Sequence, residues 1–101
     1  MSDAASGAEA GIGTLRRTLR IANKRGLHAR AAAKFVRTVG QFDANVRVAF
    51  KGQDVSGLSI MGLMMLAAGI GSDIELSCSG RQAAEAMAAL SALVEGKFGE
   101  E

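Results

Sequence analysis

The sequence predicts an α+β fold in which three helices cover one face of a four-stranded antiparallel sheet. Along the expected strands apolar residues alternate with polar ones, whereas along the expected helices they recur every three to four residues. Alternating strands bury only one face, which favours an antiparallel sheet covered on one side. The 101 residues, 49% of them hydrophobic, suffice for one compact core and are too few for two ordinary domains.

The first 13 residues are expected to form a flexible tail, because they are rich in Ala, Gly and Ser and have little to bury. The domain itself is expected to span residues 14–101. The tail has no basic start followed by an apolar run, so it does not resemble a signal peptide. The longest apolar stretch, residues 60–70, is interrupted by Gly62 and Gly69 and is shorter than the roughly 20 residues that span a bilayer. We therefore expect no membrane insertion.

The first half of the domain predicts a strand, a loop and a helix. Alternation predicts a strand over residues 15–22, in which Arg17 breaks the pattern. After a loop over residues 23–27, helical spacing predicts a helix that ends at Gly40. The apolar residues that define this helix are Ala32, Phe35, Val36 and Val39.

The second half predicts a hairpin, a short helix, a strand and a final helix. The hairpin joins residues 46–51 to 53–56 through Gly52. A short helix is expected over residues 60–68 with Ser59 as its N-cap, and a strand over residues 74–78. The last helix is expected over residues 83–94, with a capping box from Ser79 to Gln82, an end at Gly96 and a frayed chain beyond it.

Positive charge is concentrated in the first half of the chain. Eight of the 12 Lys and Arg lie between Arg16 and Arg37, and no Asp or Glu falls between Glu9 and Asp43. Within the first helix Arg30, Lys34 and Arg37 share one face. Such a face attracts phosphate groups, nucleic acid or acidic proteins, although a merely solvated outer face has the same spacing.

One cysteine and one histidine are too few for a zinc site built by this chain alone. Cys78 has no partner for an internal disulfide and is expected to be a small buried residue. We therefore expect a cytoplasmic protein with no metal or other cofactor.

His28 is the candidate for chemistry, because it stands between a glycine-containing loop and the start of the basic helix. The N-terminus of a helix presents unpaired N–H groups and the positive end of its dipole, and together these bind anions. Arg30 can add a bidentate contact to a phosphate, and a neutral imidazole is a nucleophile. The alternative is that His28 only caps the helix or packs against it.

Two separated motifs then indicate a family. The segment Asn-Lys-Arg-Gly-Leu-His-Ala-Arg at residues 23–30, with Ser-Ile-Met-Gly at residues 59–62, resembles the histidine-containing phosphocarrier proteins (HPr) of the phosphoenolpyruvate-dependent phosphotransferase system. The resemblance covers about residues 14–97. It implies the open-faced β-sandwich of that family, whose four strands and three helices have the element order expected above.

The resemblance also implies roles for single residues. His28 would be phosphorylated, on Nδ1, by phosphorylated enzyme I, and Arg30 would stabilise the phosphohistidine. The phosphoryl group would then pass to a histidine of an EIIA-type acceptor, so the chain would be a carrier and not an independent enzyme. Ser59 aligns with the serine that an HPr kinase/phosphorylase modifies in parts of the family, and it can equally be a plain N-cap.

The short helix is apolar nearly all round, so it cannot bury every side chain. By the resemblance, part of it forms a docking surface for partner proteins together with basic residues of the first helix. The expected docking residues are Ile60, Met61, Met64, Lys34 and Arg37. Leu63 and Leu66 are expected to lie in the core.

One position departs from the family pattern. Ala31 stands where the family commonly has Pro, which suits the first turn of a helix. We expect a looser turn without loss of activity, and the substitution leaves open whether this chain serves sugar uptake or a nitrogen-type regulatory branch.

Two other functions are considered beside the phosphocarrier. A small nucleic-acid-binding domain would use the basic face, but the chain has no Trp or Tyr for base stacking and no recognised RNA-binding motif. A phosphorylated regulator without transfer activity would act through Ser59 and would need neither His28 nor Arg30. We therefore expect a monomeric phosphocarrier that binds proteins and no nucleic acid.

Overall fold

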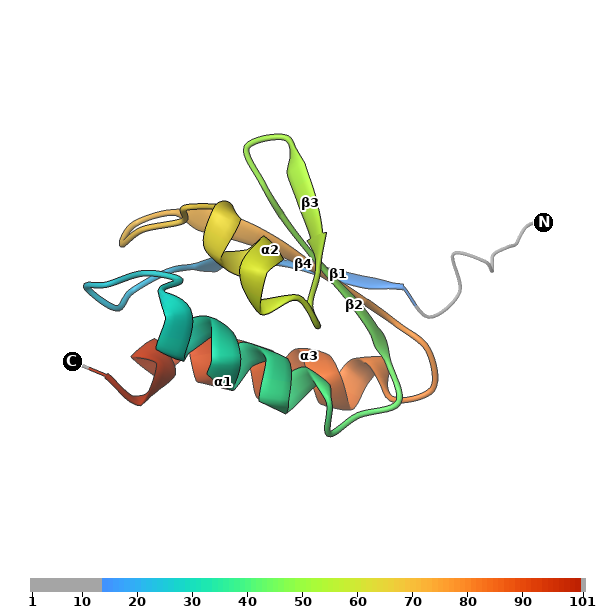
Figure 1. Ribbon diagram of the computed structural model, residues 1–101. Helices are drawn as coiled ribbons and strands as arrows, with labels where there is room; N and C mark the ends of the chain where they lie inside the picture. Colours follow the sequence, from blue (N-terminus) through green and yellow to red (C-terminus); the bar gives the residue numbers. More distant parts are fainter. Residues whose placement is uncertain (1–13, 101) are drawn as a thin grey trace.

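The computed structural model describes residues 14–100 (Figure 1). The expected tail, residues 1–13, lies outside the described residues. The strands are β1 (Leu15–Arg20), β2 (Asn45–Phe50), β3 (Gln53–Ser56) and β4 (Asp73–Ser79). The helices are α1 (Ala29–Val39), α2 (Ile60–Met65) and α3 (Ala83–Glu95), followed by the C-terminal turn (Lys97–Gly99).

The strands form one antiparallel sheet in the order β1-β4-β2-β3. In Figure 1 the helices α1 and α3 lie side by side against the sheet, and α2 packs against α1 near the edge strand β3. The predicted α+β class, element order and open-faced sandwich are therefore confirmed.

The core lies between the sheet and the helices. Inward-facing residues of the two central strands, such as Val48 and Leu76, are fully buried, and so is Phe35 of α1. Complete burial of one such side chain contributes roughly 1.5–3 kcal/mol to folding. Cys78 is also buried, as expected, and burial raises the pKa of its thiol.

Arg17, the residue that breaks the alternation of β1, lies on the helix side of the sheet. Its guanidinium donates to the buried Oγ of Ser91 at 2.9 Å and lies 3.7 Å from the carboxylate of Glu95. An arginine is tolerated there because the residue stays exposed and α3 supplies polar partners for its guanidinium.

Three expectations about element ends are wrong. The proposed capping box before α3 does not form, because Gln82 is itself the N-cap and its Oε1 accepts from the Asp43 amide at 2.8 Å. The helix expected over residues 60–68 ends at Met65, and Ala67 turns back with φ of 56°. The chain after Gly96 does not fray, because Phe98 of the C-terminal turn is 0% exposed.

Within residues 14–100 no helix is both long and apolar enough to cross a membrane.

Candidate functional site

His28 is the N-cap residue of α1, with extended backbone angles, but its side chain makes no capping hydrogen bond. The first hydrogen bond of the helix runs from the Ala32 amide to the His28 carbonyl at 2.9 Å. The amide groups of residues 29–31 therefore precede the internal ladder of the helix. The imidazole stands at an open helix N-terminus, where an anion would find donors.

The loop before His28 is shaped by Gly26, which has φ of 63°. A Cβ atom on Gly26 would lie 2.5 Å from the Ala68 carbonyl oxygen, a distance that no side chain tolerates. The same carbonyl accepts the Leu27 amide at 3.0 Å. The close approach explains why α2 ends early, since the chain after it turns back to meet this loop.

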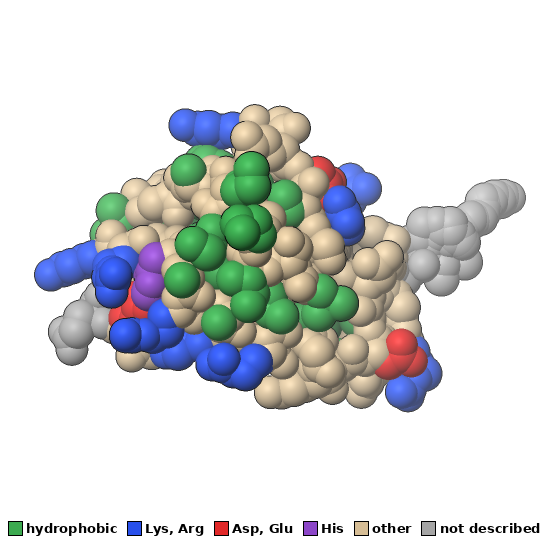
Figure 2. Space-filling model, viewed as in Figure 1, with side chains coloured by type: hydrophobic (Ala, Val, Ile, Leu, Met, Phe, Trp, Pro, Cys, Tyr) green, Lys and Arg blue, Asp and Glu red, His purple; other side chains and the backbone are tan. Residues whose placement is uncertain are grey.

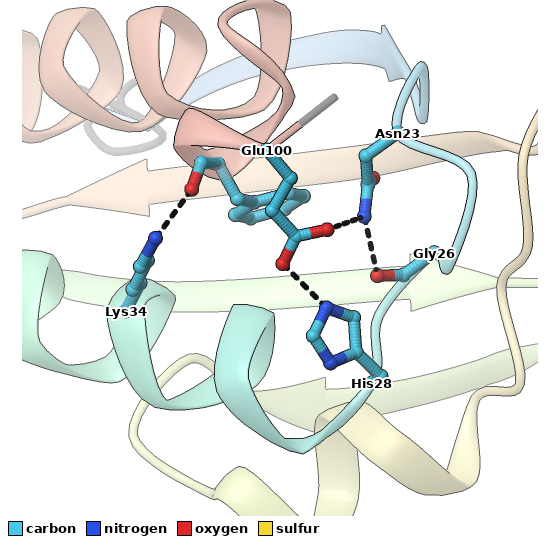
Figure 3. A network of polar contacts seen from close by, with 6 residues as sticks. Asn23, Gly26, His28, Lys34 and Glu100 are labelled. Atoms are coloured by element: carbon cyan, nitrogen blue, oxygen red, sulfur yellow. Dashed lines mark hydrogen bonds and ion pairs between the residues drawn. The ribbon is translucent and has the colours of Figure 1, made fainter.

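The C-terminus supplies a residue of the site that the sequence did not reveal. Oε2 of Glu100 lies 2.5 Å from Nε2 of His28, and Oε1 of the same carboxylate accepts from Nδ2 of Asn23 at 3.1 Å (Figure 3). Nδ2 of Asn23 also donates to the Gly26 carbonyl at 2.9 Å. Asn23 and Glu100 thus join the His28 loop to the far end of the chain.

Lys34 is one of the predicted docking residues, and the structure places it beside the C-terminal turn. Its Nζ donates to the Phe98 carbonyl at 2.6 Å (Figure 3). The side chain is only partly exposed, whereas Arg30 and Arg37 of the same helix are exposed. The predicted basic face is therefore split, with Lys34 holding the C-terminal turn.

The carboxyl group of Glu100 is held in its charged form. Burial alone would raise the pKa of Glu100, but hydrogen bonds from Asn23 and His28 and the positive charge of Lys34 outweigh it, so the pKa lies below its ordinary value. An ionised carboxylate only accepts hydrogen bonds, so Nε2 of His28 carries the hydrogen that it shares with Glu100. In the neutral ring the lone pair is then on Nδ1.

Positive charge surrounds the open end of α1. Lys24, Arg25 and Arg30 are all exposed, and the first turn of the helix contains no acidic residue. Figure 2 shows the histidine between a group of Lys and Arg side chains and a band of hydrophobic ones. Arg30 is exposed on the first turn of α1, two residues after His28, where its guanidinium could contact a phosphate on the imidazole. The arrangement suits a phosphorylated imidazole.

The hydrophobic band beside the histidine comes largely from α2. Ile60, Met61 and Met64 are exposed by 41%, 68% and 40%, whereas Leu63 and Leu66 are buried, which is the division expected from the sequence. The exposed set also includes side chains that the sequence did not single out. These are Leu58, Met65 and Ile70.

Ser59 caps α2 with its side chain. Its Oγ accepts from the Gly62 amide at 2.9 Å, and the residue is partly exposed. The predicted N-cap role is confirmed.

Among residues 14–100 there is no cluster of three or more His, Cys, Asp or Glu side chains that could hold a metal ion. Two site residues escaped sequence reasoning for different reasons. Asn23 opens the first motif, so its place in the motif was an available signal. Glu100 had none, because its role depends on a contact across 72 residues.

The comparisons with known proteins agree with this geometry. The family model described as the phosphorylation site of the HPr component of the phosphotransferase system matches residues 15–96. The phosphocarrier protein HPr of Neisseria meningitidis serogroup A is 52% identical over 86 residues, which are 85% of this chain and 97% of that protein.

Solved structures give the same result. A crystal structure of HPr from Thermoanaerobacter tengcongensis matches with a TM-score of 0.82 and 44% identity, over 86% of this chain and 98% of that one. A structure of an HPr dimer from the same organism matches with a TM-score of 0.69 and 44% identity, over 81% and 94% of the two chains. On the sequence motifs, the fold, the site and these relatives, the chain belongs to the HPr family of the phosphotransferase system.

Proposed function

We propose that this chain accepts a phosphoryl group from phosphorylated enzyme I on Nδ1 of His28 and passes it to a histidine of an EIIA-type acceptor. Membership of the HPr family supports the phosphocarrier role. The observation that supports His28 as the site is its place at the uncapped N-terminus of α1, beside the exposed Arg30.

The chemistry needs little from this chain beyond position and charge. In the neutral imidazole, Nδ1 has the lone pair because Nε2 carries the hydrogen that it donates to the Glu100 carboxylate. The phosphoryl group that arrives on Nδ1 meets the positive end of α1, and Arg30 can close on its oxygens. Transfer of a phosphoryl group depends mainly on in-line positioning and stabilisation of charge. A donor histidine held at the N-terminus of a helix meets both requirements.

For docking, we propose that partners bind the exposed side chains of α2 together with nearby basic residues. Ile60, Met61 and Met64 supply adaptable apolar contacts beside His28, and Arg37 supplies an exposed charge. Lys34 belongs to this surface only through the part of its side chain that remains exposed, because its Nζ donates a hydrogen bond to the Phe98 carbonyl.

We propose Ser59 as a regulatory site for an HPr kinase/phosphorylase. A phosphate on this N-cap would suit the dipole of α2 while adding negative charge to the docking surface, which would repel acidic partners. The test is incubation with such a kinase and ATP, with Ser59→Ala as the variant that should remain unlabelled. Equal labelling of both proteins would contradict the assignment.

The carrier role has a direct test. Incubation of the chain with phosphoenolpyruvate, magnesium and enzyme I should give an acid-labile phosphate on the chain, and mixing with an EIIA-type protein should discharge it. His28→Ala should take up no label, whereas the matched control Ser59→Ala should still be labelled. Undiminished labelling of His28→Ala would contradict the assignment of His28 as the phosphorylated residue.

We further propose that the chain works in the cytoplasm and as a monomer. The monomer is a separate matter from the chemistry, since a dimer of a related HPr has been solved. Sedimentation at micromolar concentration should give a single species with the mass of one chain, and a dimer mass would overturn this part of the proposal.

A further inference from the structure

Glu100 is held in place from several directions. The side chain of Phe98 is completely buried, Lys34 donates to the Phe98 carbonyl at 2.6 Å, and Asn23 donates to Oε1 of Glu100 at 3.1 Å. The other carboxylate oxygen then stays 2.5 Å from Nε2 of His28 (Figure 3). These anchors come from the core, from α1 and from the His28 loop, so the carboxylate has little freedom to leave the imidazole.

This contact differs from the surface ion pairs of the molecule. The side chains of His28 and Glu100 are only 15% and 14% exposed, whereas those of Arg47 and Asp54 are 47% and 60% exposed. Exposed pairs are weakened by water and salt, but a largely enclosed hydrogen bond to a charged group is stronger. The hydrogen bond between Glu100 and His28 is therefore sheltered enough from water to fix the orientation and tautomer of the imidazole.

The arrangement also has a folding cost. Asn23 is 0% exposed, and its Oδ1 has no hydrogen-bond partner among residues 14–100. Burying an unpaired amide oxygen is unfavourable, and an apolar residue at this position would avoid the penalty. The amide does, however, hold Glu100 and the Gly26 carbonyl at the same time. These two hydrogen bonds indicate that Asn23 serves to position the Glu100 carboxylate.

We propose that Glu100 is a positioning residue for phosphoryl transfer, because its carboxylate accepts the hydrogen of Nε2 and so turns the lone pair of Nδ1 toward the incoming phosphoryl group. The inference rests on the proposed carrier function of His28 and adds to it a residue 72 positions away in the chain.

The carboxylate also matches the charge that develops during transfer. As Nδ1 attacks, a bond forms from Nδ1 to phosphorus, and the bond from phosphorus to the donor nitrogen breaks with its electron pair returning to the donor. His28 keeps its proton on Nε2, so its ring gains positive charge next to the Glu100 carboxylate. In the onward step the electron pair returns to Nδ1 and the ring becomes neutral again. Glu100 thus serves both directions of transfer.

The test compares Glu100→Ala and Glu100→Gln with Glu85→Gln, which removes the same charge from an exposed position of α3. Phosphorylation of each full-length variant by enzyme I gives kcat and KM, and long-range ¹H–¹⁵N spectra of the unphosphorylated chains give the tautomer of His28. We expect Glu100→Ala to lower kcat on the order of ten-fold with little change in KM. The kcat of Glu100→Gln should fall less, because the amide oxygen of glutamine still accepts a hydrogen bond. The kcat and KM of Glu85→Gln should equal those of the unchanged chain.

The spectra should show hydrogen on Nε2 in the unchanged chain and a mixture of tautomers in Glu100→Ala. An unchanged kcat, or a rise in KM alone, in Glu100→Ala would overturn the proposal, as would an unchanged tautomer. These results are separate from failure of the carrier function, which would appear as phosphorylation of His28→Ala.

Discussion

Two helices of this molecule begin at a residue that we propose as a phosphorylation site, and the two N-termini are built differently. Ser59 turns its side chain back to α2, where Oγ accepts from the Gly62 amide at 2.9 Å. His28 turns its side chain away from α1, to Glu100, and leaves the helix without a side-chain cap. Thus α2 satisfies one of its first amides internally, whereas α1 keeps its N-terminus available for a ligand.

The difference shows where folding and function compete. A polar cap is worth about 1 kcal/mol to a helix, and α1 forgoes it at the position proposed for phosphorylation. The 11-residue α1 is also longer than the 6-residue α2, so it presents a more complete dipole to an anion. In place of a cap, the site around α1 is supported by the loop at Gly26 and by the C-terminal turn.

The largest expected effect comes from removing the anchor of the C-terminal turn. Phe98→Ala should lower the free energy of unfolding by about 3–5 kcal/mol, because it empties a fully buried position and frees Glu100 from His28. The cap of α2 should be unaffected. Urea denaturation measures the loss, and Leu58→Ala, at a site 60% exposed, should cost under about 0.5 kcal/mol. Similar costs for the two variants would contradict the role of Phe98.

The second effect tests the support of the His28 loop. Gly26 and Gly52 both have positive φ, of 63° and 81°, but a Cβ would strike the Ala68 carbonyl only at Gly26 and would meet nothing at Gly52. Gly52→Ala should therefore cost about 1 kcal/mol for backbone strain alone. Gly26→Ala should cost on the order of 3 kcal/mol, because overpacking is added. Equal unfolding free energies for the two variants would show that the loop can move away from Ala68.

A smaller effect tests the cap of α2 directly. Ser59→Ala should lower the unfolding free energy by about 1 kcal/mol, because the Gly62 amide loses its acceptor. Ser59→Asp keeps an acceptor at the N-cap and adds a charge that suits the dipole, so its stability should stay close to that of the unchanged chain. A loss of the same size in both variants would mean that Oγ does more than cap.

The smallest effect is the response of the Glu100 contact to acid. Since the folded-state pKa of Glu100 lies below its ordinary value of 4.5, its carboxylate stabilises the folded chain above that pH. This contribution should disappear as the pH falls through the lowered value. The pKa of Asp73 is also lowered, by its hydrogen bond from Arg20, so the contribution of this carboxylate to the stability of the folded chain is likewise lost as the pH falls.

The comparison with Glu100→Gln separates the two groups, because this variant retains Asp73. Urea denaturation from pH 6 downward should show a difference between the unchanged chain and Glu100→Gln that shrinks toward acid. A difference that stays constant with pH would mean that the charge of Glu100 contributes nothing to folding.

Much of the fold followed from residue patterns, and the misses have a common physical cause. Alternation located the strands, and Ser59 and Gly40 marked helix ends correctly. The start of α3 at Ala83 was predicted correctly, whereas the end of α2, the capping of α3 and the C-terminal turn were predicted wrongly. Each of these is decided by a contact from elsewhere in the chain, namely Leu27 to Ala68, Asp43 to Gln82, and Lys34 to Phe98.

The sequence by itself determined the fold class, the inward and outward faces of the helices and strands, and the proposal of His28, Arg30 and Ser59 as the residues of interest. These follow from local periodicity and from two short motifs, which a chain displays without being folded. Only the tertiary structure decided that Arg17 is tied to α3, that Lys34 holds the C-terminal turn, and that Glu100 contacts His28 directly while Asn23 holds its other carboxylate oxygen. Such contacts join residues far apart along the chain, and no local pattern encodes them.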